Sequence, residues 1–188
     1  MPGKIILLNG ASSAGKSTLS RALQATLPEP FWHVSIDHLI ASPILPQERI
    51  ASGEFAWRTL RPAFMEGFHR CLPALAEAGN NLIVEHILET AAWRERLREL
   101  LAPYDVFYVG LLCPLPELER RAQARSAGKV EESRQDFLLT PQFGPYDLEL
   151  DSTVPVEHNA ARLIAAWEQR TTPSAFVKKD FRVVSANS

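Results

Sequence analysis

The chain has 188 residues, of which 46% are hydrophobic and 22% are charged, and these values are typical of one folded domain. Its formal net charge of −2 excludes the strongly basic field that duplex DNA or an anionic membrane selects, so we expect neither nucleic acid nor a membrane as a partner. No signal peptide and no apolar run of membrane-spanning length is recognisable, and we therefore expect a cytoplasmic protein.

Short apolar segments alternate with amphipathic segments along the chain. The apolar segments predict five strands, at residues 4–9, 31–36, 81–85, 105–113 and 146–151. The other segments predict helices over residues 17–27, 58–78, 91–101, 116–126 and 156–170, with Gly128 ending the fourth. We expect Pro62 and Pro73 to bend or break the second helix. Thr90 is expected to cap the third helix, whose alternating arginines and glutamates indicate a solvated face.

This alternation of strands and helices predicts an α/β fold, in which helices cover both faces of a parallel five-stranded sheet in three layers. We expect a single domain over residues 1–170. The C-terminal tail, residues 171–188, has weak periodicity and is expected to pack loosely or to add an edge strand. In such folds ligands bind beyond the carboxyl ends of the strands, so the residues there are the candidates for function.

The segment between the first strand and the first helix reads NGASSAGKST, and residues 10–17 fit the phosphate-loop pattern G-x-x-x-x-G-K-[ST]. Glycine permits backbone angles that a side chain would forbid, so successive N–H groups can point inward and bind an anion at a helix N-terminus. We expect ATP to bind here, with Lys16 at the β- and γ-phosphates and Ser17 as a ligand of Mg²⁺. The alternative is a flexible glycine–serine turn. The residues expected to contact the nucleotide are Gly10, Ser12, Ser13, Ala14, Gly15, Lys16, Ser17 and Thr18.

Two acidic residues are expected at strand ends beside this loop. Asp37 ends the second strand, where a carboxylate can accept or orient the proton of an acceptor hydroxyl group; a helix N-cap is the alternative role. Glu85 ends the third strand, where it would contact Mg²⁺ through water or steer the acceptor, unless it is simply an exposed acid. His86 follows it and would hydrogen-bond an acceptor or fill a turn.

Residues 39–68 are unusually aromatic for a connection between two strands, and they fit either a helical core or a pocket for a partly apolar acceptor. Further along the chain, residues 119–129 are net basic. Arg121 and Arg125 are four residues apart and share a helix face, so they could close over the β- and γ-phosphates as a lid, which Arg134 could join. A solvated charged face is the alternative.

Several segments resemble chloramphenicol 3-O-phosphotransferase and its relatives: NGASSAGKST, LPEPF, SIDHLI, NLIVEHIL, DVFYVGLLCPLPELERRAQAR and YDLELDSTV. The resemblance implies a P-loop kinase fold, with ATP and Mg²⁺ as the phosphoryl donor. It also implies that Asp37 is the base for the acceptor hydroxyl and that Arg121 and Arg125 are lid arginines. The chain departs from the family at Glu85-His86, where the family tends to have two acidic residues, and throughout residues 40–61.

We therefore expect an ATP-dependent phosphotransferase that moves the γ-phosphoryl group to a hydroxyl of a small organic molecule, such as chloramphenicol or another antibiotic. Two alternatives stay open: a P-loop kinase of a nucleoside, sugar or sugar-nucleotide, and a nucleotide-binding switch that transfers no phosphate. The sequence gives no indication of the oligomeric state. The candidate catalytic residues are Lys16, Asp37, Glu85, Arg121 and Arg125, and the candidate metal ligands are Ser17 and Glu85.

Overall fold

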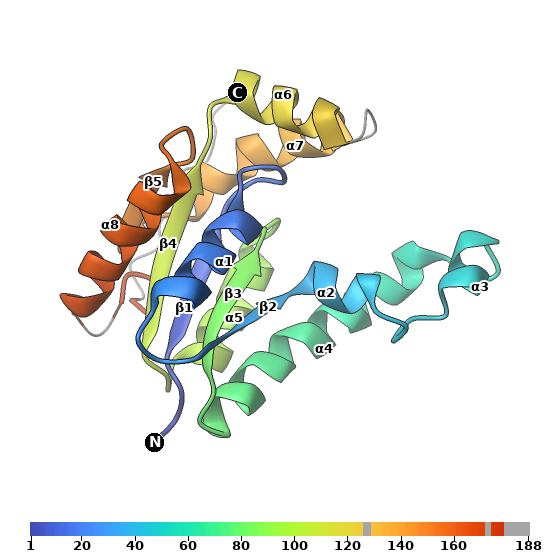
Figure 1. Ribbon diagram of the computed structural model, residues 1–188. Helices are drawn as coiled ribbons and strands as arrows, with labels where there is room; N and C mark the ends of the chain where they lie inside the picture. The colour runs from blue at the N-terminus through green and yellow to red at the C-terminus, as the bar shows by residue number, and fades with distance from the viewer. Residues whose placement is uncertain (126–128, 172–173, 179–188) are drawn as a thin grey trace.

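A computed structural model of the chain describes residues 1–125, 129–171 and 174–178. Five parallel strands form one sheet in the order β2-β3-β1-β4-β5, and helices lie against both faces of it (Figure 1). The predicted α/β fold with five parallel strands is therefore confirmed. The strands are β1 (Ile5–Asn9), β2 (Phe31–Ser35), β3 (Asn81–His86), β4 (Val106–Leu112) and β5 (Leu148–Asp151).

Helices connect the strands and follow the last one. They are α1 (Lys16–Thr26), α2 (Ile36–Ala41), α3 (Gln47–Ala51), α4 (Trp57–Glu77), α5 (Ala91–Leu101), α6 (Leu115–Arg125), α7 (Lys129–Leu139), a 3₁₀ turn η1 (Thr140–Phe143) and α8 (Val156–Glu168). Thr90 caps α5 as predicted, because its hydroxyl accepts the Trp93 N–H at 3.1 Å. The helix end predicted at Gly128 lies outside the described residues. Within the described residues, no helix is long and apolar enough to cross a membrane.

The central strand β1 separates two hydrophobic cores because its side chains alternate between the faces of the sheet. Ile6 and Leu8 point into the core formed with α1 and α8, while Ile5 and Leu7 point into the core formed with α4 and α5. All four side chains are fully buried. The unbroken apolar run of β1 is thus explained by burial on both faces.

Helix α4 continues without interruption through Pro62 and Pro73, so the break expected there does not occur. Each proline removes one helical hydrogen bond and costs about 3 kcal/mol in a helix interior. Tertiary packing offsets this cost, since Phe68 and Leu72 are buried against the sheet and contribute roughly 1.5–3 kcal/mol each. The packed face of the helix therefore overrides the local preference.

Helix α5 and the C-terminal tail both differ from what the sequence predicts. Arg94 is only 2% exposed, so the face expected to be solvated is partly buried. Its guanidinium lies 5.4 Å from the ring centroid of Phe176, which is itself fully buried and 4.8 Å from the ring of Tyr108. The described part of the tail, residues 174–178, therefore packs into the core on the α5 side and forms no edge strand.

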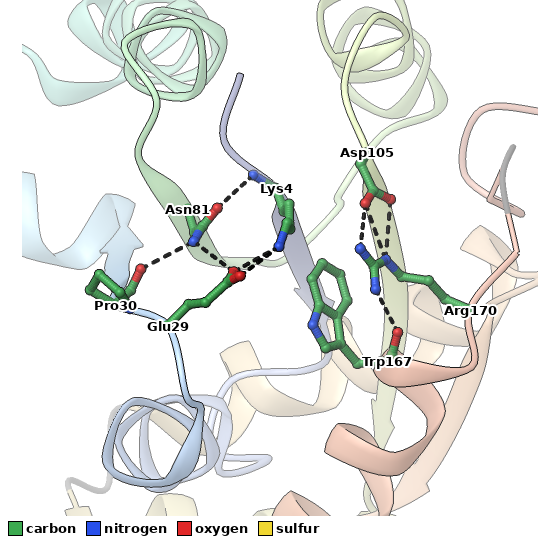
Figure 2. A network of polar contacts seen from close by, with 7 residues as sticks. All are labelled: Lys4, Glu29, Pro30, Asn81, Asp105, Trp167 and Arg170. Atoms are coloured by element: carbon green, nitrogen blue, oxygen red, sulfur yellow. Dashed lines mark hydrogen bonds and ion pairs between the residues drawn. The ribbon is translucent and has the colours of Figure 1, made fainter. Parts of the chain in front are cut away.

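The amino edge of the sheet, where the strands begin, is joined by polar contacts between segments distant in sequence (Figure 2). Lys4 Nζ is 2.7 Å from a carboxylate oxygen of Glu29, and the Lys4 backbone N–H donates to Asn81 Oδ1 at 3.0 Å. On the other side of the same edge, Arg170 Nη2 is 2.5 Å from Asp105 Oδ2. The contacts of Lys4 tie the start of β1 to the start of β3 and to the segment before β2, while Arg170 ties the start of β4 to the end of α8. The candidate site lies at the opposite edge.

Candidate active site

The phosphate loop lies between β1 and α1, at the carboxyl edge of the sheet, as the sequence predicts. A Cβ atom on Gly10 would lie 2.7 Å from the carbonyl oxygen of Leu111, so the close approach of β4 admits only glycine there. Gly15 has a φ of 101°, and Ser13 adopts a left-handed conformation with a φ of 65°. The loop thus holds a conformation that costs energy for Ser13, as is common at binding sites.

Lys16 folds back over this loop and is almost fully buried. Its Nζ donates to the carbonyl oxygens of Gly10 at 2.7 Å and of Ala11 at 2.9 Å. Burial lowers the pKa of the Lys16 ammonium, although the nearby carboxylates, Glu85 foremost, act in the opposite direction. Lys16 therefore presents a cation close to the loop amides.

The groups around the loop fit a bound phosphate chain. The hydroxyl of Ser13 is buried and has no hydrogen-bond partner within the described structure. All of the predicted nucleotide contacts from Ser12 to Thr18 line one cavity of about 1100 Å³, whereas Gly10 lies behind it, against β4. An orphaned hydroxyl, a buried ammonium and a helix N-terminus together suit a polyanion.

Glu85 is buried at the end of β3 and receives three side-chain contacts. The hydroxyl of Ser17 donates to its Oε2 at 3.0 Å, the hydroxyl of Ser20 lies 3.2 Å from its Oε1, and His33 Nε2 also contacts Oε1. Burial alone would raise the pKa of Glu85, but the hydrogen bond from His33, together with Lys16 and Ser17, holds it below its usual value. Glu85 is thus ionised and next to Ser17, and the alternative of an exposed acid is wrong.

Ser17 and Glu85 are therefore adjacent, as two candidate ligands of one metal ion would be. Among the described residues, no group of three or more histidine, cysteine, aspartate or glutamate side chains could hold a metal ion. Mg²⁺ does not need such a group, because it commonly binds through one or two protein ligands, water and the phosphates of its nucleotide. The pair fits that mode of binding.

Asp37 was predicted to end the second strand, but it lies two residues beyond the observed end of β2. Strand β2 ends at Ser35, whose hydroxyl caps α2 by accepting the Asp37 N–H at 3.0 Å. Asp37 is therefore in the first turn of α2 and is not the N-cap. Its side chain lines the same cavity as Lys16 and Glu85, so the three predicted residues are brought together.

The two predicted lid arginines lie on α6 beside the loop, and both line the cavity. Arg121 donates to the carbonyl oxygens of Ala14 at 3.1 Å and Ser152 at 2.9 Å, and to Glu117 at 2.7 Å. These bonds hold Arg121 against the loop, whereas Arg125 is exposed one helical turn further along. Arg134, on α7, instead pairs with Glu119 of α6 at 2.6 Å.

The segment 39–68 contributes to both the core and the cavity. The prediction that it binds an acceptor stays a prediction. Phe68 is buried in the core, while Ile40, Trp57 and Met65 line the cavity. Arg61 also lines it, paired with Glu89 and 4.9 Å from the ring centroid of Trp93. The end of the cavity near Asp37 thus combines apolar walls with one ion pair.

His86 lines the cavity from β3 and packs against a second buried histidine, His69 of α4. The two Nε2 atoms are 2.9 Å apart, so one ring donates a hydrogen bond to the other. Burial lowers the pKa of His69 to about 4 and that of His86 to about 3. Both rings are therefore neutral near pH 7.

Three residues that contact the site were missed in the sequence. Asp136 of α7 accepts the Ser12 N–H at 2.9 Å, and burial raises the pKa of its carboxyl group. His33 contacts Glu85 from the neighbouring strand. No spacing motif marks Asp136 or His33, because each contacts a residue that is distant in the sequence. Ser20 could have been found, since it lies one helical turn after Lys16 and Ser17.

The fold and the loop define the class of protein. A parallel sheet of this order, with a phosphate loop after β1, is the fold of the P-loop kinases. APS kinase CysC of Mycobacterium tuberculosis, solved with AMPPNP and APS, superimposes with a TM-score of 0.68 at 20% identity, over 89% of this chain and 98% of that one. A sugar kinase from Janibacter sp. HTCC2649 superimposes with a TM-score of 0.64 at 18% identity, over 89% of this chain and 95% of that one.

The family is more specific than the fold. The model of the family described as "Chloramphenicol phosphotransferase-like protein" matches residues 3–169. The chain therefore belongs to that family. A curated relative, "Putative O-phosphotransferase Rv2636" of Mycobacterium tuberculosis, is 27% identical over 203 residues, covering 97% of this chain and 90% of the relative. The family resemblance predicted from the sequence is confirmed.

Proposed function

We propose that the protein transfers the γ-phosphoryl group of ATP to a hydroxyl group of a small, partly apolar organic molecule. One observation carries the proposal: the phosphate loop, Asp37, Ile40 and Trp57 all line a single cavity of about 1100 Å³. A cavity of this size suits two small molecules meeting, rather than a macromolecule. Membership of a phosphotransferase-like family supports the same reaction class.

The donor would be held by groups of the phosphate loop and of α6. The amides of the loop and the Lys16 ammonium would bind the β- and γ-phosphates, and Arg121 and Arg125 would neutralise charge on the transferred group. Ser17 and Glu85 would hold Mg²⁺, directly or through water. When bound, Mg²⁺ would neutralise part of the phosphate charge during transfer.

The acceptor would bind between α2 and α4. Asp37 would orient the acceptor hydroxyl or accept its proton as the oxygen attacks the γ-phosphorus and ADP leaves. Ile40, Trp57 and Met65 would pack against the apolar part of the acceptor, and the Arg61–Glu89 pair would hydrogen-bond its polar groups. Chloramphenicol is the first compound to test because of the family, and nucleosides and sugars follow because the ion pair suits them as well.

The test is a coupled assay of ADP release with ATP, Mg²⁺ and a panel of acceptors. Asp37→Asn is expected to keep nucleotide affinity and to lower turnover by about 10²-fold or more, the range for loss of a general base. Glu77→Gln, an exposed acid at the far end of α4, is the matched control and should behave as the wild type.

Two results would contradict the proposal. Full turnover in Asp37→Asn would remove that carboxylate from the reaction. ATP binding without acceptor-dependent ADP release for any hydroxyl compound in the panel would instead favour a nucleotide-binding switch.

A further inference from the structure

The two carboxylate oxygens of Glu85 have different surroundings. Oε2 accepts a hydrogen bond from the hydroxyl of Ser17, at the mouth of the phosphate loop. Oε1 faces the opposite way, towards His33 on β2 and Ser20 on α1. One oxygen is thus anchored to the protein interior, and the other is presented to the candidate metal site.

The position of His33 follows from the register of the sheet. Ser35 of β2 pairs with Glu85 of β3, and His33 lies two residues earlier on β2, so its side chain is on the same face of the sheet as Glu85. Helix α1 covers that face and brings Ser20 to the same oxygen. Two elements, β2 and α1, therefore converge on Oε1.

The contact is buried and lies behind the cavity. The side chains of His33 and Glu85 are 9% and 6% exposed, and His33 does not line the cavity itself. The hydroxyl proton of Ser20 is shared with the carbonyl oxygen of Lys16, at 2.9 Å, so Ser20 is the weaker of the two anchors. His33 therefore reaches the candidate metal site through its contact with Glu85.

We propose that His33 is a positioning residue, which, with Ser20, fixes the Glu85 carboxylate so that Oε2 faces the Mg²⁺ that accompanies the nucleotide. The inference rests on the proposed function, because it assumes that a nucleotide and Mg²⁺ bind at this site. Partners of metal-ligating groups behave in this way in general, and their loss typically lowers metal affinity 10–100-fold.

The experiment measures binding and does not depend on turnover. Calorimetry gives the affinity of a non-hydrolysable ATP analogue in EDTA and in Mg²⁺, and the ratio of the two is the gain from the metal. His33→Leu is expected to reduce this gain by about 10-fold while leaving the affinity in EDTA unchanged. His33→Gln, which keeps a donor of similar reach, should restore most of it, and Ser20→Ala should show a smaller loss than His33→Leu.

The matched control is His38→Gln, because His38 is exposed and its ring contacts that of His33 at 4.5 Å between centroids without contacting Glu85. It should keep the full gain from Mg²⁺. An unchanged gain in His33→Leu, or an equal loss of affinity in EDTA and in Mg²⁺, would overturn the inference and leave the proposed function intact. If His33→Leu does not fold, an unchanged gain in Ser20→Ala overturns it instead. A wild-type protein that binds no analogue in either condition would overturn both.

Discussion

The polar groups at the two edges of the sheet differ in their exposure to solvent and in their hydrogen-bond partners. At the amino edge, Lys4 and Glu29 are 37% and 48% exposed, and each charge has a partner from another segment (Figure 2). At the carboxyl edge, Lys16 and Glu85 are less than a tenth exposed, and Ser13 combines a left-handed backbone with an unpartnered buried hydroxyl. The charges of the first edge are paired with one another, whereas the second edge carries the groups that the proposed nucleotide would contact.

This contrast separates stability from function. Exposed ion pairs such as those of the amino edge contribute about 0–1 kcal/mol each, so no single one is essential to the fold. Buried charges at the carboxyl edge cost energy to hold, and under the proposed function this cost is offset by their role in binding the nucleotide. Substitutions at the two edges should therefore have opposite consequences.

The largest effect is expected from Lys16→Met at the carboxyl edge. Loss of the ammonium should lower phosphotransfer by about 10²–10³-fold or more, because a charge aimed at the phosphates disappears. The melting temperature should change little, because removal of a buried charge and loss of the hydrogen bonds to the carbonyls of Gly10 and Ala11 act in opposite directions. A phosphotransfer assay and thermal denaturation check this, with Lys4→Met as the control. A parallel fall of activity and melting temperature would break the comparison.

An intermediate effect is expected from acid, through the buried pair of His69 and His86. Their pKa values, lowered to about 4 and about 3, lie below the 6.5 of an unfolded histidine. The unfolded chain therefore takes up protons before the folded one does, so stability is lost as the pH falls from 6.5 towards 4. The slope reaches at most roughly 1.4 kcal/mol per pH unit for each histidine.

Denaturant titrations at several pH values measure this slope. His69→Gln should make it shallower, because Gln does not titrate, while His158→Gln, an exposed histidine on α8, should leave it unchanged. A slope that is equally steep in His69→Gln would assign the acid sensitivity to other groups.

The smallest effect is expected at the amino edge. Asp105→Asn should lower the free energy of unfolding by about 1 kcal/mol, because Arg170 and Asp105 are 19% and 30% exposed and share several hydrogen bonds. Glu29→Gln, at the more exposed pair, should cost less than about 0.5 kcal/mol. Phosphotransfer should be unchanged in both. A loss of activity comparable to that of Lys16→Met would show that the edges are coupled.

Local patterns were enough to predict the fold class and the phosphate loop. Apolar runs marked the five strands, and the glycines, Lys16 and Ser17 lie within one contiguous segment. Asp37 and Glu85 were predicted from their nearness to strand ends, and this worked because parallel strands end at the same edge.

The parts that could not be predicted depend on tertiary contacts. Asp136 meets Ser12 across 124 positions, and His33 meets Glu85 across 52, so neither pair leaves a local pattern. The continuity of α4 through Pro73 depends on how well its buried face packs, which propensity does not report. The burial of Arg94 has the same origin, because the residue that covers it comes from beyond α8.

Phe176 has a consequence for where the folding unit ends. The family match stops at residue 169, yet this ring fills space beside Tyr108 of β4 and beneath Arg94 of α5. A truncation after α8 would open a hole the size of a phenyl ring next to a buried guanidinium, which water would then enter. The boundary of the family match is therefore shorter than the boundary set by packing.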